Sequence, residues 1–245
     1  MNYRLPRVVG HRGAAASAPE NTLAGIRRAH ALGVSWVEFD VNLTRDGVAV
    51  LMHDATLERT TDGKGTVEET DWEDLRRLDA GRWFAPAFAG ERVPSFAETI
   101  ELLLALGLSA NVEIKPSPGR EAETGTAVAA ELARRWPTDR ALPLLSSFQE
   151  ASLAAARDAV PVLPRGLLIS RTPPDWRARL ERLDCVSYHC NHRHLDPGTV
   201  AAVKQAGWPV LVYTVNEAER ARTLYEWGVD GIVTDRPDAI LPVAV

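Results

Sequence analysis

The chain has 245 residues, 45% of them hydrophobic, and carries a formal net charge of −5 at pH 7. We therefore expect one globular domain over residues 1–245, long enough to bury a full core. Lysine and arginine are dispersed and form no basic stripe, which excludes nucleic acid as a partner. The first apolar segment, at Val8 and Val9, is too short for a signal-peptide core or a membrane span. We expect a cytoplasmic protein without stable membrane insertion.

Short β-branched segments alternate with helical patterns along the whole chain. Eight of these segments are typical of parallel strands, near residues 7–11, 36–41, 110–115, 142–148, 163–169, 185–190, 210–215 and 231–235. Eight strand and helix units predict an α/β fold, the (β/α)8 or TIM barrel.

Capping signals predict where the helices begin. Thr22 precedes a helix that ends at Gly33, and Ser95 with Glu98 forms a capping box. The same cap spacing recurs at Ser147 with Glu150, at Asn216 with Glu219 and at Thr70 with Glu73, while Asp196-Pro197 is an N-cap followed by proline.

The strand and helix rhythm is interrupted at residues 54–94, which we interpret as an insertion over the barrel mouth or one flank. Four aromatic residues gather there, Trp72, Trp83, Phe84 and Phe88. A small satellite core is the favoured interpretation of these rings, ahead of a platform for substrate.

The segment from Trp36 to Asp54 predicts a β-hairpin around Asp46-Gly47, a dipeptide typical of a two-residue type I′ turn. If Arg45 and Val48 close that turn, Asp40 faces His53 across the ladder. Alternation then places Glu38, Asp40 and His53 on one face.

Functional residues of such barrels gather where the strands end, at the carboxyl face. In the segment 110–115, Asn111, Glu113 and Lys115 share a face. With Glu38 and Asp40, Glu113 makes a set of three carboxylates suited to one hard divalent cation, Mg²⁺ or Ca²⁺. No thiolate or histidine cluster joins them, which argues against zinc.

Two histidines from different strands, His11 and His53, are candidates for a general acid and a general base. Arg12 and Lys115 supply donors for an anion. A metal, two cations and two histidines together indicate phosphoryl transfer.

The sixth strand contains other groups that could suggest a second metal site. His189, Cys190, His192 and His194 match no common zinc spacing, so we expect a polar rim there. Cys185 and Cys190 point to opposite faces, which makes a disulfide between them implausible.

Several linked motifs resemble those of one known family. They read, in chain order, His11-Arg12-Gly13, Pro19-Glu20-Asn21-Thr22, Glu38-Phe39-Asp40-Val41, Thr44-Arg45-Asp46-Gly47-Val48, His53-Asp54, Thr56-Leu57-Glu58-Arg59-Thr60-Thr61, Glu113-Ile114-Lys115, Tyr213-Thr214-Val215-Asn216 and Asp230-Gly231-Ile232-Val233-Thr234-Asp235. In this order they are similar to the glycerophosphodiester phosphodiesterases, and the resemblance spans nearly the whole chain.

The resemblance implies a (β/α)8 barrel with a small insertion after the second strand. It also implies hydrolysis of glycerophosphodiesters, such as glycerophosphocholine or glycerophosphoethanolamine, to glycerol 3-phosphate and an alcohol. His11 and His53 match the family's acid/base pair. The other matches are the metal ligands Glu38, Asp40 and Glu113 and the phosphate contacts Arg12 and Lys115. Tyr213 stands where the family often has tryptophan, and we expect it to line the substrate pocket.

Two other functions stay open. One is a phospholipase D-like sphingomyelinase or lysophospholipase, which shares the barrel and the histidine pair but is usually secreted and disulfide-bonded. The other is a non-catalytic barrel that binds phosphodiesters, although a pure binder needs no acid/base pair. The sequence does not decide between Mg²⁺ and Ca²⁺, between the two histidine roles, or whether the chain forms a homo-oligomer.

Overall fold

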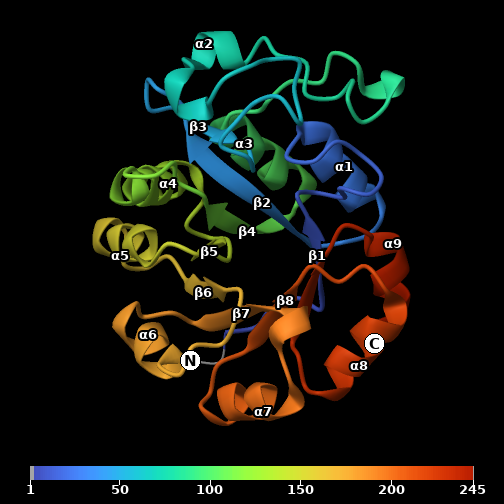
Figure 1. The fold of residues 1–245 in the computed structure, drawn as a ribbon, viewed down its shortest axis with the longest axis vertical. Helices are drawn as coiled ribbons and strands as arrows, with labels where there is room; N and C mark the ends of the chain where they lie inside the picture. Colours follow the sequence, from blue (N-terminus) through green and yellow to red (C-terminus); the bar gives the residue numbers. More distant parts are fainter. Residues whose placement is uncertain (1–2, 245) are drawn as a thin grey trace.

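The computed structural model describes residues 3–244 of the chain, which form a closed barrel of parallel strands surrounded by helices (Figure 1). The parallel strands are β1 (Val8–His11), β2 (Trp36–Leu43), β4 (Ser109–Ile114), β5 (Leu144–Ser147), β6 (Arg165–Ile169), β7 (Ser187–Asn191), β8 (Val210–Tyr213) and β9 (Gly231–Thr234). The barrel closes because β1 pairs with both β2 and β9. The predicted (β/α)8 fold is confirmed, with every predicted strand in its place.

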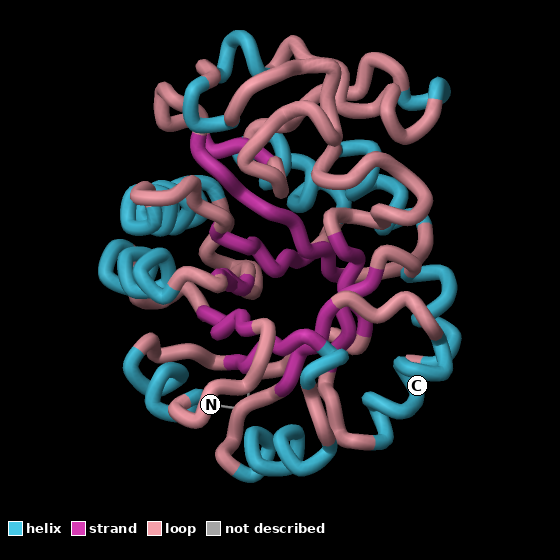
Figure 2. The backbone as a smooth tube through the Cα atoms, in the orientation of Figure 1, coloured by secondary structure: helices cyan, strands magenta, loops and turns pink. Residues whose placement is uncertain are grey.

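Helices cover the outside of the strand ring, as Figure 2 shows. They are α1 (Leu23–Ala31), α3 (Phe96–Leu106), α4 (Glu121–Arg135), α5 (Glu150–Ala159), α6 (Trp176–Arg182), α7 (Pro197–Gln205), α8 (Ala218–Glu226) and α9 (Pro237–Ile240), with 3-10 turns η3 (His192–His194) and η4 (Leu241–Val243).

Strand β2 shows why the barrel can carry a polar site. Its odd residues Val37, Phe39 and Val41 are buried in the main core, where Phe39 packs on Phe96 of α3 with ring centroids 6.0 Å apart. Side chains alternate along a strand, so Glu38 and Asp40 point to the barrel interior. The helices thus cover the apolar face, and the polar face is left for chemistry.

Three of the predicted helix caps are confirmed. The Thr22 side chain accepts a hydrogen bond from Gly25 N, Ser95 and Glu98 form the capping box, and Asp196 accepts from Thr199 N. These side chains satisfy amide groups that have no partner within the helix.

The other three cap predictions are wrong. Helices α5 and α8 begin after Gln149 and Glu217, and the N-cap of the short helix α2 (Trp72–Leu75) is Asp71. Ser147 instead donates from Oγ to the Ile114 carbonyl at 2.6 Å, joining β5 to β4. The Asn216 side chain instead forms hydrogen bonds with residues at the end of β9.

The predicted hairpin exists, but its register is shifted by one residue. Short strand β3 (Ala49–Leu51) pairs with β2 so that Asn42 faces Val50. Thr44 and Val48 close a three-residue loop, in which Gly47 has a φ of 79° and donates from N to Thr44 O at 3.1 Å. A three-residue loop with one left-handed glycine is a common alternative to the type I′ turn.

The register shift corrects the predicted pairing of Asp40 with His53. Met52 donates from N to Asp40 O at 3.2 Å, so Met52 is the residue opposite Asp40. His53 comes after the end of β3, and its position depends on the segment that follows, not on the strand ladder.

Residues 54–94 follow the hairpin and hold 3-10 turn η1 (Val67–Glu69), helix α2 (Trp72–Leu75) and 3-10 turn η2 (Pro86–Phe88). They lie across the top of the view in Figure 1. A second apolar cluster packs beneath them, made of Val50, Met52, Leu57, Val67, Leu75, Ala80 and Val93. Trp72 packs against this cluster, as expected. Trp83, Phe84 and Phe88 do not belong to it, so the satellite-core interpretation is wrong for these three rings.

Candidate active site

The three predicted metal ligands meet at the carboxyl end of the barrel. Asp40 of β2 is the register partner of Glu113 of β4. Glu38 lies two residues before Asp40, on the same face of β2. Each of the three offers a carboxylate oxygen, and these oxygens all lie within 4.8 Å of one another. Oxygen ligands at this spacing suit Mg²⁺ or Ca²⁺, which prefer carboxylates. Among the described residues, no other group of three or more metal-ligating side chains comes together.

The charges of this cluster are incompletely balanced by the protein. Burial, then the neighbouring charge of Asp40, raises the pKa of Glu38 above its usual range and that of Glu113 to about 7. Burial would also raise the pKa of Asp40, but the charges of Arg12 and Lys115 outweigh it and lower that pKa to about 2. A divalent cation would keep all three carboxylates ionised, which is the electrostatic reason that the residues fit a metal.

Both predicted phosphate contacts lie at the same cluster. Lys115 Nζ is 3.3 Å from Asp40 Oδ1 and 3.4 Å from Glu113 Oε1. Arg12 Nε is 3.2 Å from Asp40 Oδ2, and the Arg12 amide donates to Glu38 Oε2 at 3.1 Å. Asn21 holds Asp40 from the other side, donating from Nδ2 to Oδ2 at 2.9 Å. The two cations are therefore fixed beside the acidic cluster.

His11, at the end of β1, is oriented by residues at the end of β9. Its Nδ1 is 2.5 Å from Asp235 Oδ1, and its Nε2 is 3.8 Å from Glu38 Oε2. Asn216 donates from Nδ2 to Asp235 Oδ2 at 2.7 Å, which fixes the carboxylate in turn. Because a carboxylate at Nδ1 favours the proton on that nitrogen, Nε2 is the ring atom left facing the acidic cluster.

His53 has a carboxylate partner of its own. Its Nδ1 lies 2.6 Å from Asp54 Oδ1, and Arg59 donates from Nε to Asp54 Oδ2 at 2.5 Å. Arg59 also donates to both oxygens of Glu20 at 2.8 Å, and Glu20 Oε1 accepts from Arg12 Nη1 at 2.7 Å. Burial lowers the pKa of His53, although the charge of Asp40 opposes this. A chain of ion pairs thus connects His53 to Arg12, the predicted phosphate contact.

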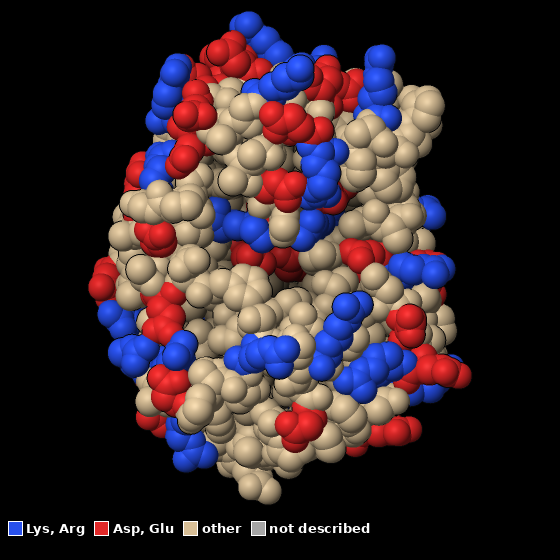
Figure 3. Space-filling model, in the orientation of Figure 1, with Lys and Arg blue, Asp and Glu red and all other residues tan. Residues whose placement is uncertain are grey.

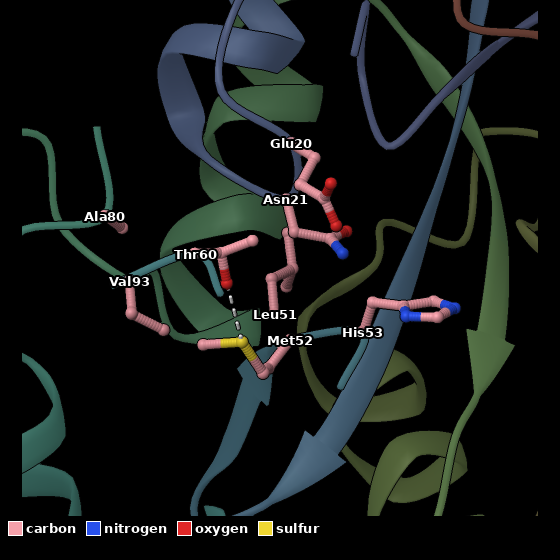
Figure 4. Close-up of a pocket in the computed structure, with 8 residues that line it drawn as sticks. All are labelled: Glu20, Asn21, Leu51, Met52, His53, Thr60, Ala80 and Val93. Atoms are coloured by element: carbon pink, nitrogen blue, oxygen red, sulfur yellow. Dashed lines mark hydrogen bonds between the residues drawn. The ribbon is translucent and has the colours of Figure 1, made fainter. Parts of the chain in front are cut away.

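The shape of the site agrees with this arrangement. Figure 3 shows a hollow in the middle of one face, with acidic atoms at its bottom and basic atoms along its upper rim. Figure 4 shows His53 at the edge of the hairpin, below Glu20 and Asn21, with Met52 on the side away from the imidazole. The hydrogen bond from Thr60 Oγ1 to Met52 Sδ, 3.4 Å long, holds the insertion on the hairpin beside His53.

Tyr213, the predicted pocket residue, lies at the end of β8. It lines a small cavity together with His11, Glu38 and Glu113. Its hydroxyl donates to Ile169 O at 2.6 Å, and the exposed ring of Phe148 packs edge-on against it. Asn111 lines the same cavity, and its buried Oδ1 has no hydrogen-bond partner among the described residues.

The groups at the sixth strand of the barrel do not form a second centre. His189 is buried, and its Nε2 lies 2.8 Å from Ser187 Oγ. Burial lowers the pKa of His189 to about 3, so the ring is neutral in the core. Cys185 and Cys190 are buried free thiols, as predicted.

Several residues of the site had no assigned role in the sequence. Asp54, Arg59 and Asp235 stand inside the motifs of the resemblance, but the sequence alone gave no reason to pair them with the histidines. Asn216 was explained as a helix cap, although it binds Asp235. Asp54 directly follows His53 after the hairpin, and Asp235 directly follows the last strand. These positions are the signal by which the sequence could have identified the two aspartates.

The fold and these side chains are those of a barrel enzyme that acts on phosphate esters, and comparisons with known proteins agree. The model of the "Glycerophosphoryl diester phosphodiesterase family" matches residues 11–239. A glycerophosphodiester phosphodiesterase of Caldanaerobacter subterraneus subsp. tengcongensis is 35% identical over 239 residues, covering 96% of each chain.

Solved structures show the same likeness. An Oleispira antarctica phosphodiesterase, in complex with the product sn-glycerol-3-phosphate, is 40% identical with a TM-score of 0.95, over 98% of this chain and 96% of that one. A glycerophosphodiester phosphodiesterase of Agrobacterium tumefaciens has a TM-score of 0.79 at 28% identity, over 98% of this chain and 99% of that one.

The chain belongs to the glycerophosphoryl diester phosphodiesterase family. The predicted family and the predicted enzyme class, a phosphoric diester hydrolase, are confirmed. Within residues 3–244, no helix combines the length and the apolar character that crossing a bilayer requires.

Proposed function

We propose that this protein hydrolyses glycerophosphodiesters to glycerol 3-phosphate and an alcohol, with one divalent cation held by Glu38, Asp40 and Glu113. The observation that carries the proposal is the acidic cluster, within 4.8 Å, beside two histidines that each have a carboxylate at Nδ1. The glycerol 3-phosphate bound to the Oleispira antarctica relative supports the choice of substrate.

In the proposed mechanism, a bound Mg²⁺ or Ca²⁺ would supply charge that neutralises the phosphodiester oxygens. Arg12 and Lys115 add donors to the same anion and hold it in place. One histidine takes a proton at Nε2 from the attacking hydroxyl, either a water or the glycerol 2-hydroxyl. Attack by the 2-hydroxyl gives a cyclic glycerol phosphate, which a water molecule then opens to glycerol 3-phosphate. The other histidine gives its Nε2 proton to the departing alcohol oxygen, so that no alkoxide has to leave.

The ion pairs around the site hold His11, His53 and Arg12 in fixed positions for that reaction. Asp235 and Asp54 each lie at hydrogen-bond distance from Nδ1 of their histidine and hold the ring in one orientation. Glu20 binds both Arg12 and Arg59, so the phosphate contact and the support of His53 share one carboxylate. The proposal explains why so many charged side chains are fixed at one end of the barrel.

A coupled assay for glycerol 3-phosphate, with glycerophosphocholine as substrate, tests the proposal. We expect release with Mg²⁺ or Ca²⁺ present, loss of activity with a chelator, and recovery when the cation is restored. Glu113→Gln should lower activity strongly, whereas Glu73→Gln, at an exposed carboxylate of α2, should not. Activity unaffected by chelation would contradict the metal, and binding without turnover would indicate a phosphodiester-binding barrel. Release of choline from sphingomyelin or lysophosphatidylcholine, without turnover of glycerophosphocholine, would indicate the sphingomyelinase alternative.

A further inference from the structure

A cleft of about 380 Å³ opens beside His11 and Arg12, which also contact the acidic cluster. Its lining is partly apolar, with Ala15, Ala16 and the insertion rings Trp83 and Phe84, and partly charged, with Arg12, Glu20, Asp235 and Arg236. A volume of this order suits a small organic group, since ligand pockets start at roughly 300 Å³. Because His11 is part of the wall, a group bound here lies next to a proton donor or acceptor.

The loop that carries the two rings is tightly fixed. The Asp79 carboxylate accepts hydrogen bonds from the amides of Gly81, Arg82 and Gly90, at 2.9, 2.8 and 2.8 Å. A Cβ added at Gly81 would lie 2.0 Å from the Phe88 carbonyl oxygen, so the chain can pass there only with glycine. One aspartate thus holds both ends of the loop.

Further contacts fix the loop on the rest of the molecule. Trp83 donates from Nε1 to the Ala80 carbonyl at 2.8 Å, and Glu91 Oε1 accepts from the amide of Ala24 in α1 at 3.1 Å. The later part of the insertion accordingly lies above α1 in Figure 1. Side chains on such a loop are positioned before a ligand arrives.

The two rings are presented to solvent and to the cleft. Trp83 is 40% exposed, which is unusual for a tryptophan, and it packs edge-on against Phe84 with centroids 5.7 Å apart. Phe84 packs in the same way on Phe88, at 5.6 Å. Core packing with the other described residues does not account for the exposed surface of these two rings.

Most polar side chains of the cleft already have partners within the protein. Both oxygens of Glu20 accept from arginines, and those of Asp235 accept from His11 and Asn216. Asn216 Oδ1 accepts from Thr234 Oγ1 at 3.0 Å and from the Asp235 amide at 2.9 Å. Each arginine of the cleft has a carboxylate beside it, since Arg12 donates to Glu20 and Arg236 Nη2 lies 3.6 Å from Asp238 Oδ2. The acceptor atoms of the walls are therefore mostly occupied, and the rings and methyl groups offer the apolar surface.

We infer that this cleft binds the alcohol side of the diester and favours a methylated ammonium alcohol, with Trp83 and Phe84 as the recognition surface. The inference rests on the proposed function, because it orients the same substrate. A quaternary ammonium has no N–H group and needs no acceptor, and it is attracted to the face of tryptophan. A primary ammonium would instead need acceptor atoms, and those of this wall already accept from the protein's own donors. The departing oxygen then lies beside His11.

Two matched substrates test the charge of the head group. Glycerophosphocholine is compared with its neutral isostere, the diester of 3,3-dimethylbutanol, and glycerophosphoethanolamine serves as the primary ammonium. We expect the wild-type kcat/KM to be highest for glycerophosphocholine. Trp83→Ala should lower that value about tenfold and the value for the isostere much less, as expected for a lost cation–π contact. Trp83→Phe should restore part of the loss, and Phe84→Ala should cause a smaller one.

Phe88→Leu is the matched control, because it changes a ring of the same loop that does not line the cleft. It should leave the preference for glycerophosphocholine in place. Equal losses on all three diesters in Trp83→Ala, or the same loss of preference in Phe88→Leu, would overturn the inference while leaving the proposed function intact. A wild-type preference for the neutral isostere would also overturn it. Failure of the wild type to hydrolyse any of these diesters would instead contradict the proposed function.

Discussion

The carboxylate of Asp235, at the end of the last barrel strand, lies 2.5 Å from Nδ1 of His11, at the end of the first. The two residues are far apart in sequence, and the closure of the barrel through pairing of β1 with β9 brings them together. One strand pair therefore creates a histidine whose ring orientation and tautomer are fixed.

This contact predicts a positioning role for Asp235. Asp235→Asn should lower kcat at least about tenfold with a smaller change in KM, since an amide at Nδ1 can hold the ring in the wrong tautomer. Steady-state kinetics on glycerophosphocholine, with the pH profile of kcat, measures this. Asp238→Asn is the control, because Asp238 is a nearby exposed acid that pairs with Arg236. An unchanged pH profile in Asp235→Asn would show that the contact is structural alone.

Arg59 is predicted to support His53 from the insertion. It bridges Asp54 and Glu20, so Arg59→Ala should release both and lower kcat about tenfold or more. Arg59→Lys should recover little, because a lysine cannot bind both carboxylates as a planar guanidinium does. Arg45→Ala removes a comparable surface pair with Asp71 and should retain wild-type kinetics. Wild-type kcat in Arg59→Ala would refute the role.

The orientation inferred from the cleft assigns the two histidines different roles. With His11 beside the departing oxygen, His11→Ala should lose about 10² to 10⁴ in rate on glycerophosphocholine. It should lose much less on a p-nitrophenyl diester of glycerol phosphate, whose leaving group needs no proton. His53→Ala should lose a similar factor on both substrates. The reverse pattern, with His53→Ala rescued by the better leaving group, would exchange the roles.

Metal binding should depend on pH in a defined direction. Glu38 and Glu113 have raised pKa values in the metal-free protein, that of Glu113 reaching about 7 from 4.5. A carboxyl group with a raised folded pKa stabilises the fold at low pH, and this contribution is lost as pH rises through the folded pKa. The metal-free protein should therefore become less stable between about pH 5 and about pH 8.

Added Mg²⁺ or Ca²⁺ should reverse that loss, because the cation binds the ionised carboxylates and displaces protons. The rise in Tm on adding metal, measured by calorimetry, should be larger at about pH 8 than at about pH 5.5. Glu113→Gln should remove most of this difference. A rise in Tm that is equal at both pH values would show that the cluster does not bind the cation through ionised carboxylates.

The sequence alone determined the barrel and the main members of the site. The alternation of Glu38 and Asp40 with Val37, Phe39 and Val41 is a local property of one strand, and it separates a polar face from an apolar one whatever surrounds it. Barrel strands end at one face, so residues such as His11 and Glu113 could be assigned to a common site before their distances were known.

Tertiary structure decided what depends on contacts between distant segments. The three-residue loop ending in Gly47 shifted the hairpin register, so His53 is positioned by the insertion and by Asp54, not by a cross-strand neighbour. Trp83 and Phe84 look like core residues in the sequence, but the loop held by Asp79 turns them toward the cleft. The alternation of side chains along a strand is determined by neighbouring residues. The partner of a side chain across the barrel depends instead on barrel closure and packing, which no local sequence pattern encodes.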